Sequence, residues 1–126
     1  VTRGRGVSAF INPRQYERSA MLVITHAHRE SVLDLTDDEL LEAHTLAREL
    51  ARAAATALDA GGALIYQRNG MVSGQNVPHY HVHVIPRYAD SGPNVDVFRR
   101  RDIDTKADFA TRAELAKRIG GALGLK

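Results

Sequence analysis

The segment from residue 79 to residue 85 reads His-Tyr-His-Val-His-Val-Ile, and this alternation restricts the fold more than any other feature of the sequence. Successive side chains of a β-strand point to opposite faces of a sheet, so the pattern predicts a strand with three imidazoles on one face. Tyr80, Val82 and Val84 would then face a hydrophobic core. We therefore expect a sheet with one covered face and a histidine face that looks onto a cleft or solvent.

A long amphipathic helix is expected before this strand, from about residue 37 to residue 60. The segment Thr36–Glu39 has the pattern of a capping box, with acidic residues where the helix dipole favours them. Gly61 and Gly62 are expected to end the helix. Apolar residues at steps of three and four form one stripe for packing against the sheet, made up of Leu40, Ala43, Ala47, Leu50, Ala54 and Leu58.

The remaining patterns predict a single mixed domain over residues 1–126. Short apolar runs predict further strands at 7–11, 20–25, 63–68 and 95–98. A terminal helix is expected over about residues 111–120, with Leu115 and Ile119 facing inward. The fold class is therefore α+β, with an antiparallel sheet of about five strands, one long amphipathic helix and a C-terminal helix.

Composition argues against several kinds of site and partner. The chain has no cysteine, which excludes disulfides and thiolate chemistry. Its net charge is only +2, which does not suggest a nucleic-acid-binding protein. The best apolar run, residues 20–24, is far too short for a membrane helix, and no signal-peptide pattern is visible. We expect a cytoplasmic protein with neither a membrane nor a nucleic-acid partner.

The histidine row permits more than one chemistry. A neutral imidazole can act as a nucleophile, and a protonated neighbour can neutralise phosphate oxygens or protonate a leaving group. Neutral imidazoles are also good zinc ligands, although no nearby carboxylate or cysteine completes the usual ligand set. A polar, solvated strand face without any function is the third interpretation.

The segment Gly74–Arg87 resembles the signature of the histidine-triad (HIT) family, in which Gly-Gln precedes three alternating histidines. The order of the upstream elements is also similar, so the resemblance covers roughly residues 7–88. It implies a HIT-like fold in which the middle histidine, His81, attacks an α-phosphorus and forms a nucleotidyl-histidine intermediate. His79 and His83 would orient His81 and engage the phosphate.

The resemblance implies nucleotide-binding positions as well. Gly74, Gln75 and Asn76 match the loop that cradles the phosphate, and Asn12 matches the position that contacts the ribose. Arg68 falls where asparagine or glutamine is usual and would bring a positive charge near the phosphates. Other departures are Asn76 in place of serine or threonine, and Ser19-Ala20 where many members have Gly-His.

The function implied by the resemblance is that of a nucleotide hydrolase or transferase. It would act on a phosphoanhydride or phosphoramidate, with a dinucleoside-polyphosphate-like substrate expected. Ile85-Pro86-Arg87 resembles the bacterial HIT hydrolases and the dinucleoside-polyphosphate hydrolases more than the phosphoramidase branch. No metal site or cofactor is required of the protein, although the substrate could arrive as a magnesium complex. A homodimer is expected, paired through the long helix and a strand. The alternatives are a nucleotide-binding protein with little turnover and a metal-binding domain that uses the histidine row.

Overall fold

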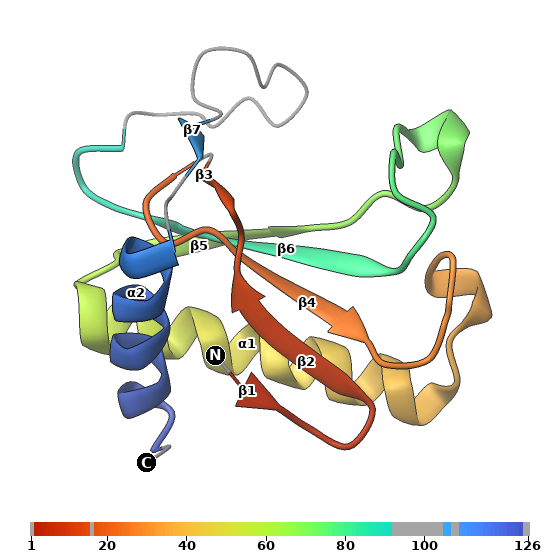
Figure 1. Cartoon of the computed structure of the whole chain (residues 1–126), viewed down its shortest axis with the longest axis horizontal. Helices are drawn as coiled ribbons and strands as arrows, with labels where there is room; N and C mark the ends of the chain where they lie inside the picture. Colours follow the sequence, from red (N-terminus) through yellow and green to blue (C-terminus); the bar gives the residue numbers. More distant parts are fainter. Residues whose placement is uncertain (1, 16, 92–104, 107–108, 125–126) are drawn as a thin grey trace.

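The computed structural model describes residues 2–15, 17–91, 105–106 and 109–124, and its core is a five-stranded antiparallel sheet with one covered face (Figure 1). The order across this sheet is β1-β2-β4-β6-β5. Its strands are β1 Thr2–Arg3, β2 Val7–Ile11, β4 Met21–Thr25, β6 His81–Arg87 and β5 Gly62–Tyr66. A small second sheet pairs β3 Arg14–Gln15 with β7 Thr105–Lys106.

Two α-helices and two short 3₁₀-helices complete the described chain. The long helix α1 covers one face of the sheet, and α2 packs against α1 and the β2 side (Figure 1). The bounds are α1 Asp37–Leu58, α2 Phe109–Ala122, η1 Val32–Asp34 and η2 Met71–Ser73. The α+β prediction is confirmed, while the strand expected at 95–98 lies outside the described residues.

The hydrophobic core lies between α1 and the covered face of the sheet. Alternate residues of β2 and β4 are buried there, together with Tyr80 just before β6 and Val82 and Val84 on β6, as the histidine alternation predicts. Leu115 and Ile119 of α2 close one side of the same core, which confirms their inward prediction. The opposite face of the sheet, called the open face below, is not covered by a helix of the described chain (Figure 1). It carries the remaining residues of each strand, which include the triad histidines.

Helix α1 begins as the sequence predicts. The Thr36 hydroxyl accepts from the Glu39 N–H at 3.1 Å, and the Glu39 carboxylate accepts from the Thr36 N–H at 2.8 Å. This reciprocal pair is the capping box, which satisfies two backbone donors that no helical carbonyl can reach.

The helix ends earlier than the glycine pair predicts, and its apolar stripe is slightly different. Asp59, with φ 60° and ψ 34°, is the left-handed residue that stops the helix, because a short polar side chain tolerates that conformation. Gly61 and Gly62 do not end it, and β5 begins at Gly62. Leu40 is 39% exposed and outside the core, whereas Ala53 is buried in the stripe.

The histidine strand and the strand before it are also displaced from their predicted bounds. Strand β6 begins at His81 rather than at residue 79, because the His79 N–H donates to the Val77 carbonyl in a turn. Strand β5 stops at Tyr66, so Arg68 lies beyond the ladder. No helix in the described ranges is long and apolar enough to cross a membrane.

The start of α1 is tied to the segment that follows β4. The Arg29 guanidinium donates to the Glu39 carboxylate at 3.0 Å, and the Tyr80 N–H donates to the Arg29 carbonyl at 2.6 Å. The backbone N–H of Thr36, followed by the Arg29 contact, lowers the pKa of the Glu39 carboxyl. Arg29 thus joins the helix start to the residue between the first two triad histidines.

We predict that Glu39→Gln destabilises the protein at pH 7 and does so much less at pH 3. A carboxyl with a lowered folded-state pKa contributes stability above its unfolded value, near pH 4.3, and loses it as the pH falls through the folded value. Urea unfolding of both proteins at the two pH values measures the difference. Glu49→Gln, which removes a half-exposed carboxylate of the same helix that pairs with the exposed Arg48 and Arg52, is the matched control. An equal loss at both pH values would contradict the assigned role.

Candidate active site

The open face of the sheet carries a shallow apolar pocket beside the triad. Phe10 on β2 and Leu22 and Ile24 on β4 line it, together with Val77, His79 and His81, and its volume is about 270 Å³. Strand register explains this composition, because Ile24 pairs with His81 and Leu22 pairs with His83 across β4 and β6. The pocket is thus a flat apolar floor with imidazoles along one side.

His81 has the most informative hydrogen bond in the site. Its Nδ1 lies 2.7 Å from the backbone carbonyl oxygen of His79. A carbonyl oxygen only accepts, so Nδ1 donates and carries the ring proton. In the neutral ring Nε2 then keeps a free lone pair, which is the state that a nucleophilic imidazole needs.

His79, which lies in the turn before β6, is also held by a backbone carbonyl. Its Nε2 donates to the Thr25 carbonyl at 2.8 Å, which fixes the ring over the end of β4. The His28 ring packs edge-on against it with centroids 5.8 Å apart. His79 therefore borders the apolar pocket with one nitrogen already engaged.

His83 is the buried member of the triad, with 6% of its surface exposed. Its ring stacks on Tyr66 with centroids 4.4 Å apart and planes 5° from parallel. The edge-to-face contact with His81 has centroids 5.2 Å apart. Tyr66 and His83 are paired residues of β5 and β6, so sheet register creates the stack. Sequence reasoning missed Tyr66, and only the register of two predicted strands could have indicated it.

The loop between β5 and β6 has a defined structure that Gln75 holds in place. The Gln75 side chain is only 8% exposed and makes three hydrogen bonds. Its carbonyl oxygen accepts from the Gly70 N–H at 2.7 Å, and its amide nitrogen donates to the Glu30 carbonyl at 2.5 Å and the Val77 carbonyl at 3.0 Å. Gln75 therefore shapes the loop, and a direct phosphate contact by its side chain stays a prediction.

Gly74 and Asn76 stand on either side of Gln75. Gly74 has φ +92°, a left-handed conformation that favours glycine, and its N–H donates to the Met71 carbonyl at 2.9 Å. Asn76 is exposed and makes no hydrogen bond within the part of the chain that the structure describes. Its backbone and side-chain donors are therefore available to an anion at this loop.

Asn12 and Arg68 flank the triad on opposite sides of the open face. Asn12 is buried directly after β2, and its N–H donates to the Ala20 carbonyl at 2.8 Å. Asn12 comes two residues after Phe10, so strand alternation places both side chains on the same face of the sheet. Arg68 follows β5 and packs against Gly74. The structure thus gathers the predicted residues around one face, while their ligand contacts stay predictions.

The histidine row does not assemble a metal-ligand cluster in the described residues. No group of three or more His, Cys, Asp or Glu side chains in these ranges is placed to hold a metal ion. The geometric reason lies in the carbonyl contacts, since His81 Nδ1 and His79 Nε2 point to backbone oxygens.

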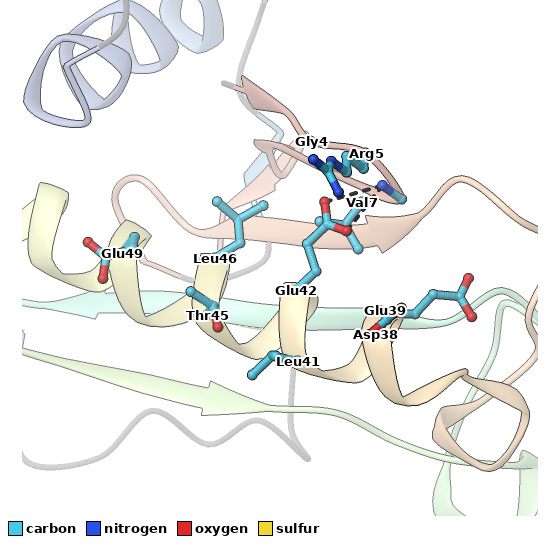
Figure 2. A pocket seen from close by; sticks show the side chains of 11 residues that line it. Gly4, Arg5, Val7, Asp38, Glu39, Leu41, Glu42, Thr45, Leu46 and Glu49 are labelled. Atoms are coloured by element: carbon cyan, nitrogen blue, oxygen red, sulfur yellow. Dashed lines mark hydrogen bonds between the residues drawn. The ribbon is translucent and has the colours of Figure 1, made fainter.

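A larger hollow, of about 700 Å³, lies away from the triad between the β1–β2 hairpin and α1 (Figure 2). Its lining includes Asp38, Glu39, Glu42 and Glu49. Both Glu42 carboxylate oxygens accept from the Gly6 N–H at 3.2 Å, so Glu42 secures the hairpin to the helix. A hollow rich in carboxylates repels anions, so an anionic ligand is better accommodated by the smaller apolar pocket beside His81.

Comparisons with known proteins agree with this geometry. Residues 4–90 match the HIT domain family. Protein hit of Bacillus subtilis is 30% identical over 118 residues, covering 92% of this chain and 81% of that protein. The asymmetrical bis(5'-nucleosyl)-tetraphosphatase of Schizosaccharomyces pombe is 34% identical over 80 residues, covering 64% of this chain and 44% of that enzyme. A crystal structure of a Hit-like protein from Bartonella henselae superposes with TM-score 0.81 at 26% identity, covering 96% of this chain and 83% of that one.

We predict that the Tyr66–His83 stack contributes about 1 kcal/mol to stability, the range found for aromatic pairs. A double-mutant cycle of Tyr66→Leu and His83→Leu measures it, because the cycle isolates the term that the two rings share. Tyr66→Phe keeps the flat ring and should retain the coupling, which separates stacking from the phenol hydroxyl. A coupling free energy near zero would show that the two rings are merely adjacent.

Proposed function

The chain belongs to the HIT domain family, and we propose that it is a nucleotide hydrolase or transferase that acts at an α-phosphorus through His81. The observation that carries the proposal is the 2.7 Å hydrogen bond from His81 Nδ1 to the His79 carbonyl. That bond leaves Nε2 as the basic nitrogen of the neutral ring. The free nitrogen stands beside an apolar pocket of the kind that suits a nucleobase.

The reaction has two displacements at phosphorus. In the first, the Nε2 lone pair of His81 forms an N–P bond while the bond from phosphorus to the leaving group breaks, and the leaving atom takes the electron pair. In the second, a water oxygen bonds to phosphorus, the N–P bond breaks with its electron pair returning to Nε2, and the water releases a proton to the solvent. The carbonyl of His79 favours the first step, because its contact with Nδ1–H strengthens as the ring becomes positively charged.

The proposed substrate lies across the open face. Its base would occupy the pocket lined by Phe10 and Ile24, its ribose would approach Asn12, and its phosphates would meet the donors of Asn76. A nucleoside phosphoanhydride of the dinucleoside polyphosphate type fits this proposal, as does a phosphoramidate. The Schizosaccharomyces pombe relative, named a dinucleoside tetraphosphatase, supports the first of these. The protein itself would need no cofactor, and magnesium would arrive with the substrate.

We predict that the wild-type protein releases AMP from diadenosine tetraphosphate or adenosine 5′-phosphoramidate and that His81→Ala lowers the rate by at least about 10³-fold. Removal of a covalent nucleophile leaves only the catalysis supplied by binding and electrostatics. Chromatographic measurement of AMP over time tests this. His44→Ala, which removes an exposed imidazole on α1, is the matched control and should stay near the wild-type rate.

Two results would argue for the alternatives. Tight nucleotide binding with equal, negligible AMP release by wild type and His81→Ala would favour a binding protein over an enzyme. Stoichiometric zinc in the purified protein, lost in His81→Ala, would favour the metal-binding interpretation.

We also propose that the protein forms a homodimer through β5 and α1. Strand β5 is one of the two outer strands of the sheet and pairs only with β6 in the described chain. Ile65 on this strand is 41% exposed, although its partner on β6, Val84, is a core residue. Beside it, a shallow hollow is lined by Ala51, Ala55 and Ala63, together with Arg48 and Arg52 of α1. An apolar edge strand beside small helix residues is a surface that a second copy could extend.

We predict that Ile65→Lys converts a dimer into a monomer. A lysine at the edge of a paired strand introduces a charge that pairing would have to desolvate. Light scattering after size-exclusion chromatography gives the mass directly. Leu33→Lys, a change of the same kind at a residue that is 86% exposed, should leave the mass unchanged. A wild-type protein with the mass of one chain would contradict the dimer proposal.

A further inference from the structure

Arg68 follows β5, at the place where an extension of the β5–β6 register would set it opposite His81. Tyr66 pairs with His83 in the antiparallel β5–β6 ladder, so two residues after Tyr66 correspond to two residues before His83. The Arg68 guanidinium carbon lies 5.7 Å from the centre of the Tyr66 ring, which itself stacks on His83. The Arg68 side chain therefore lies on the open face, on the β5 side of the triad.

The loop between β5 and β6, which contains Gly74 and Asn76, leaves room for this side chain. A Cβ on Gly74 would lie 3.1 Å from Arg68 Cδ and 3.3 Å from Nε, tighter than ordinary contacts. The absence of a side chain at Gly74 therefore lets the guanidinium stem pass directly along the loop. This places a permanent positive charge beside the same loop that offers the unused donors of Asn76.

The nucleoside pocket lies on the other side of the triad. Phe10 belongs to β2 and Leu22 to β4, whereas Arg68 follows β5, and β6 stands between them in the sheet. A substrate with its base over β2 and β4 and its α-phosphorus over His81 continues toward β5. The group that His81 displaces is thus the part of the substrate that comes within reach of the guanidinium.

A guanidinium discriminates between leaving groups by charge. When a phosphoanhydride is cleaved, the bridging oxygen takes the electron pair of the broken P–O bond, and negative charge builds up on the departing phosphate. A guanidinium stabilises that charge with directed hydrogen bonds. When a phosphoramidate is cleaved, nitrogen takes the electron pair and a proton and departs as an amine. Arginine gives no proton at ordinary pH and does little for that step.

We propose that Arg68 makes this protein selective for nucleotides with a phosphate leaving group over nucleotides with an amine leaving group. This inference rests on the proposed function, since it concerns the group that His81 displaces. Arg68 acts here on specificity, and His81 supplies the bond-forming atom for both substrate classes. An amide at the same position would offer a hydrogen bond without the charge, so the selectivity follows from the arginine.

The test compares two substrates that share the adenylyl half: diadenosine tetraphosphate and adenosine 5′-phosphoramidate, at one fixed magnesium concentration. We expect Arg68→Gln to lower kcat/KM for the tetraphosphate about 10- to 100-fold, the effect of losing a charge-assisted hydrogen bond. The phosphoramidate value should change by less than about threefold. Arg68→Lys, which keeps the charge, should recover part of the tetraphosphate activity. Arg5→Gln, which removes an exposed arginine at the hollow away from the triad, is the matched control.

The outcomes separate this inference from the function on which it rests. Equal losses on both substrates, or no loss on either, would overturn the leaving-group role of Arg68 and leave the His81 chemistry standing. A wild-type protein that cleaves neither substrate would overturn the proposed function and this inference with it. Thermal melting of each variant controls for unfolding, because a destabilised protein would lose both activities together.

Discussion

The hydrogen bond from His81 Nδ1 to the His79 carbonyl depends on a change of backbone direction two residues before β6. In a continuous strand the carbonyl of residue 79 would point into the ladder toward a neighbouring strand. Here the chain turns at residues 77–80, the His79 N–H donates to Val77, and the Tyr80 N–H donates to Arg29. The carbonyl is thereby free to meet the ring of its own strand, and one local turn sets the tautomer of the middle histidine.

The turn is held by one residue in the core and by one in the preceding loop. Below it, Tyr80 is buried in the core against α1, and this burial raises the pKa of the Tyr80 phenol to about 12. Above it, Gln75 ties the preceding loop to the Glu30 and Val77 carbonyls. Core packing and loop bracing therefore converge on the same few residues. Neither Tyr80 nor Gln75 lines the apolar pocket, so both supports leave it open.

Much of this arrangement follows from local sequence, because local rules act over a few residues. Side-chain alternation correctly separated His81 from Val82, and the capping pattern correctly identified the start of α1 at Thr36. The end of a helix is harder to predict where several nearby residues can stop it. Asp59, and not Gly61, ends α1. Contacts set by register or distance were not visible: Tyr66 reaches His83 only through strand pairing, and Gln75 reaches Glu30 across 45 residues.

The central claim, that His81 Nε2 bonds to phosphorus, is tested most directly by locating the nucleotidyl group on the protein. The protein is mixed with diadenosine tetraphosphate, quenched in alkaline denaturant within milliseconds and digested with trypsin. The peptide of residues 69–87 contains all three triad histidines, and fragmentation mass spectrometry distinguishes them. The account predicts an adenylyl group on His81 alone. AMP release with no adduct on this peptide, or an adduct on His79 or His83, would contradict it.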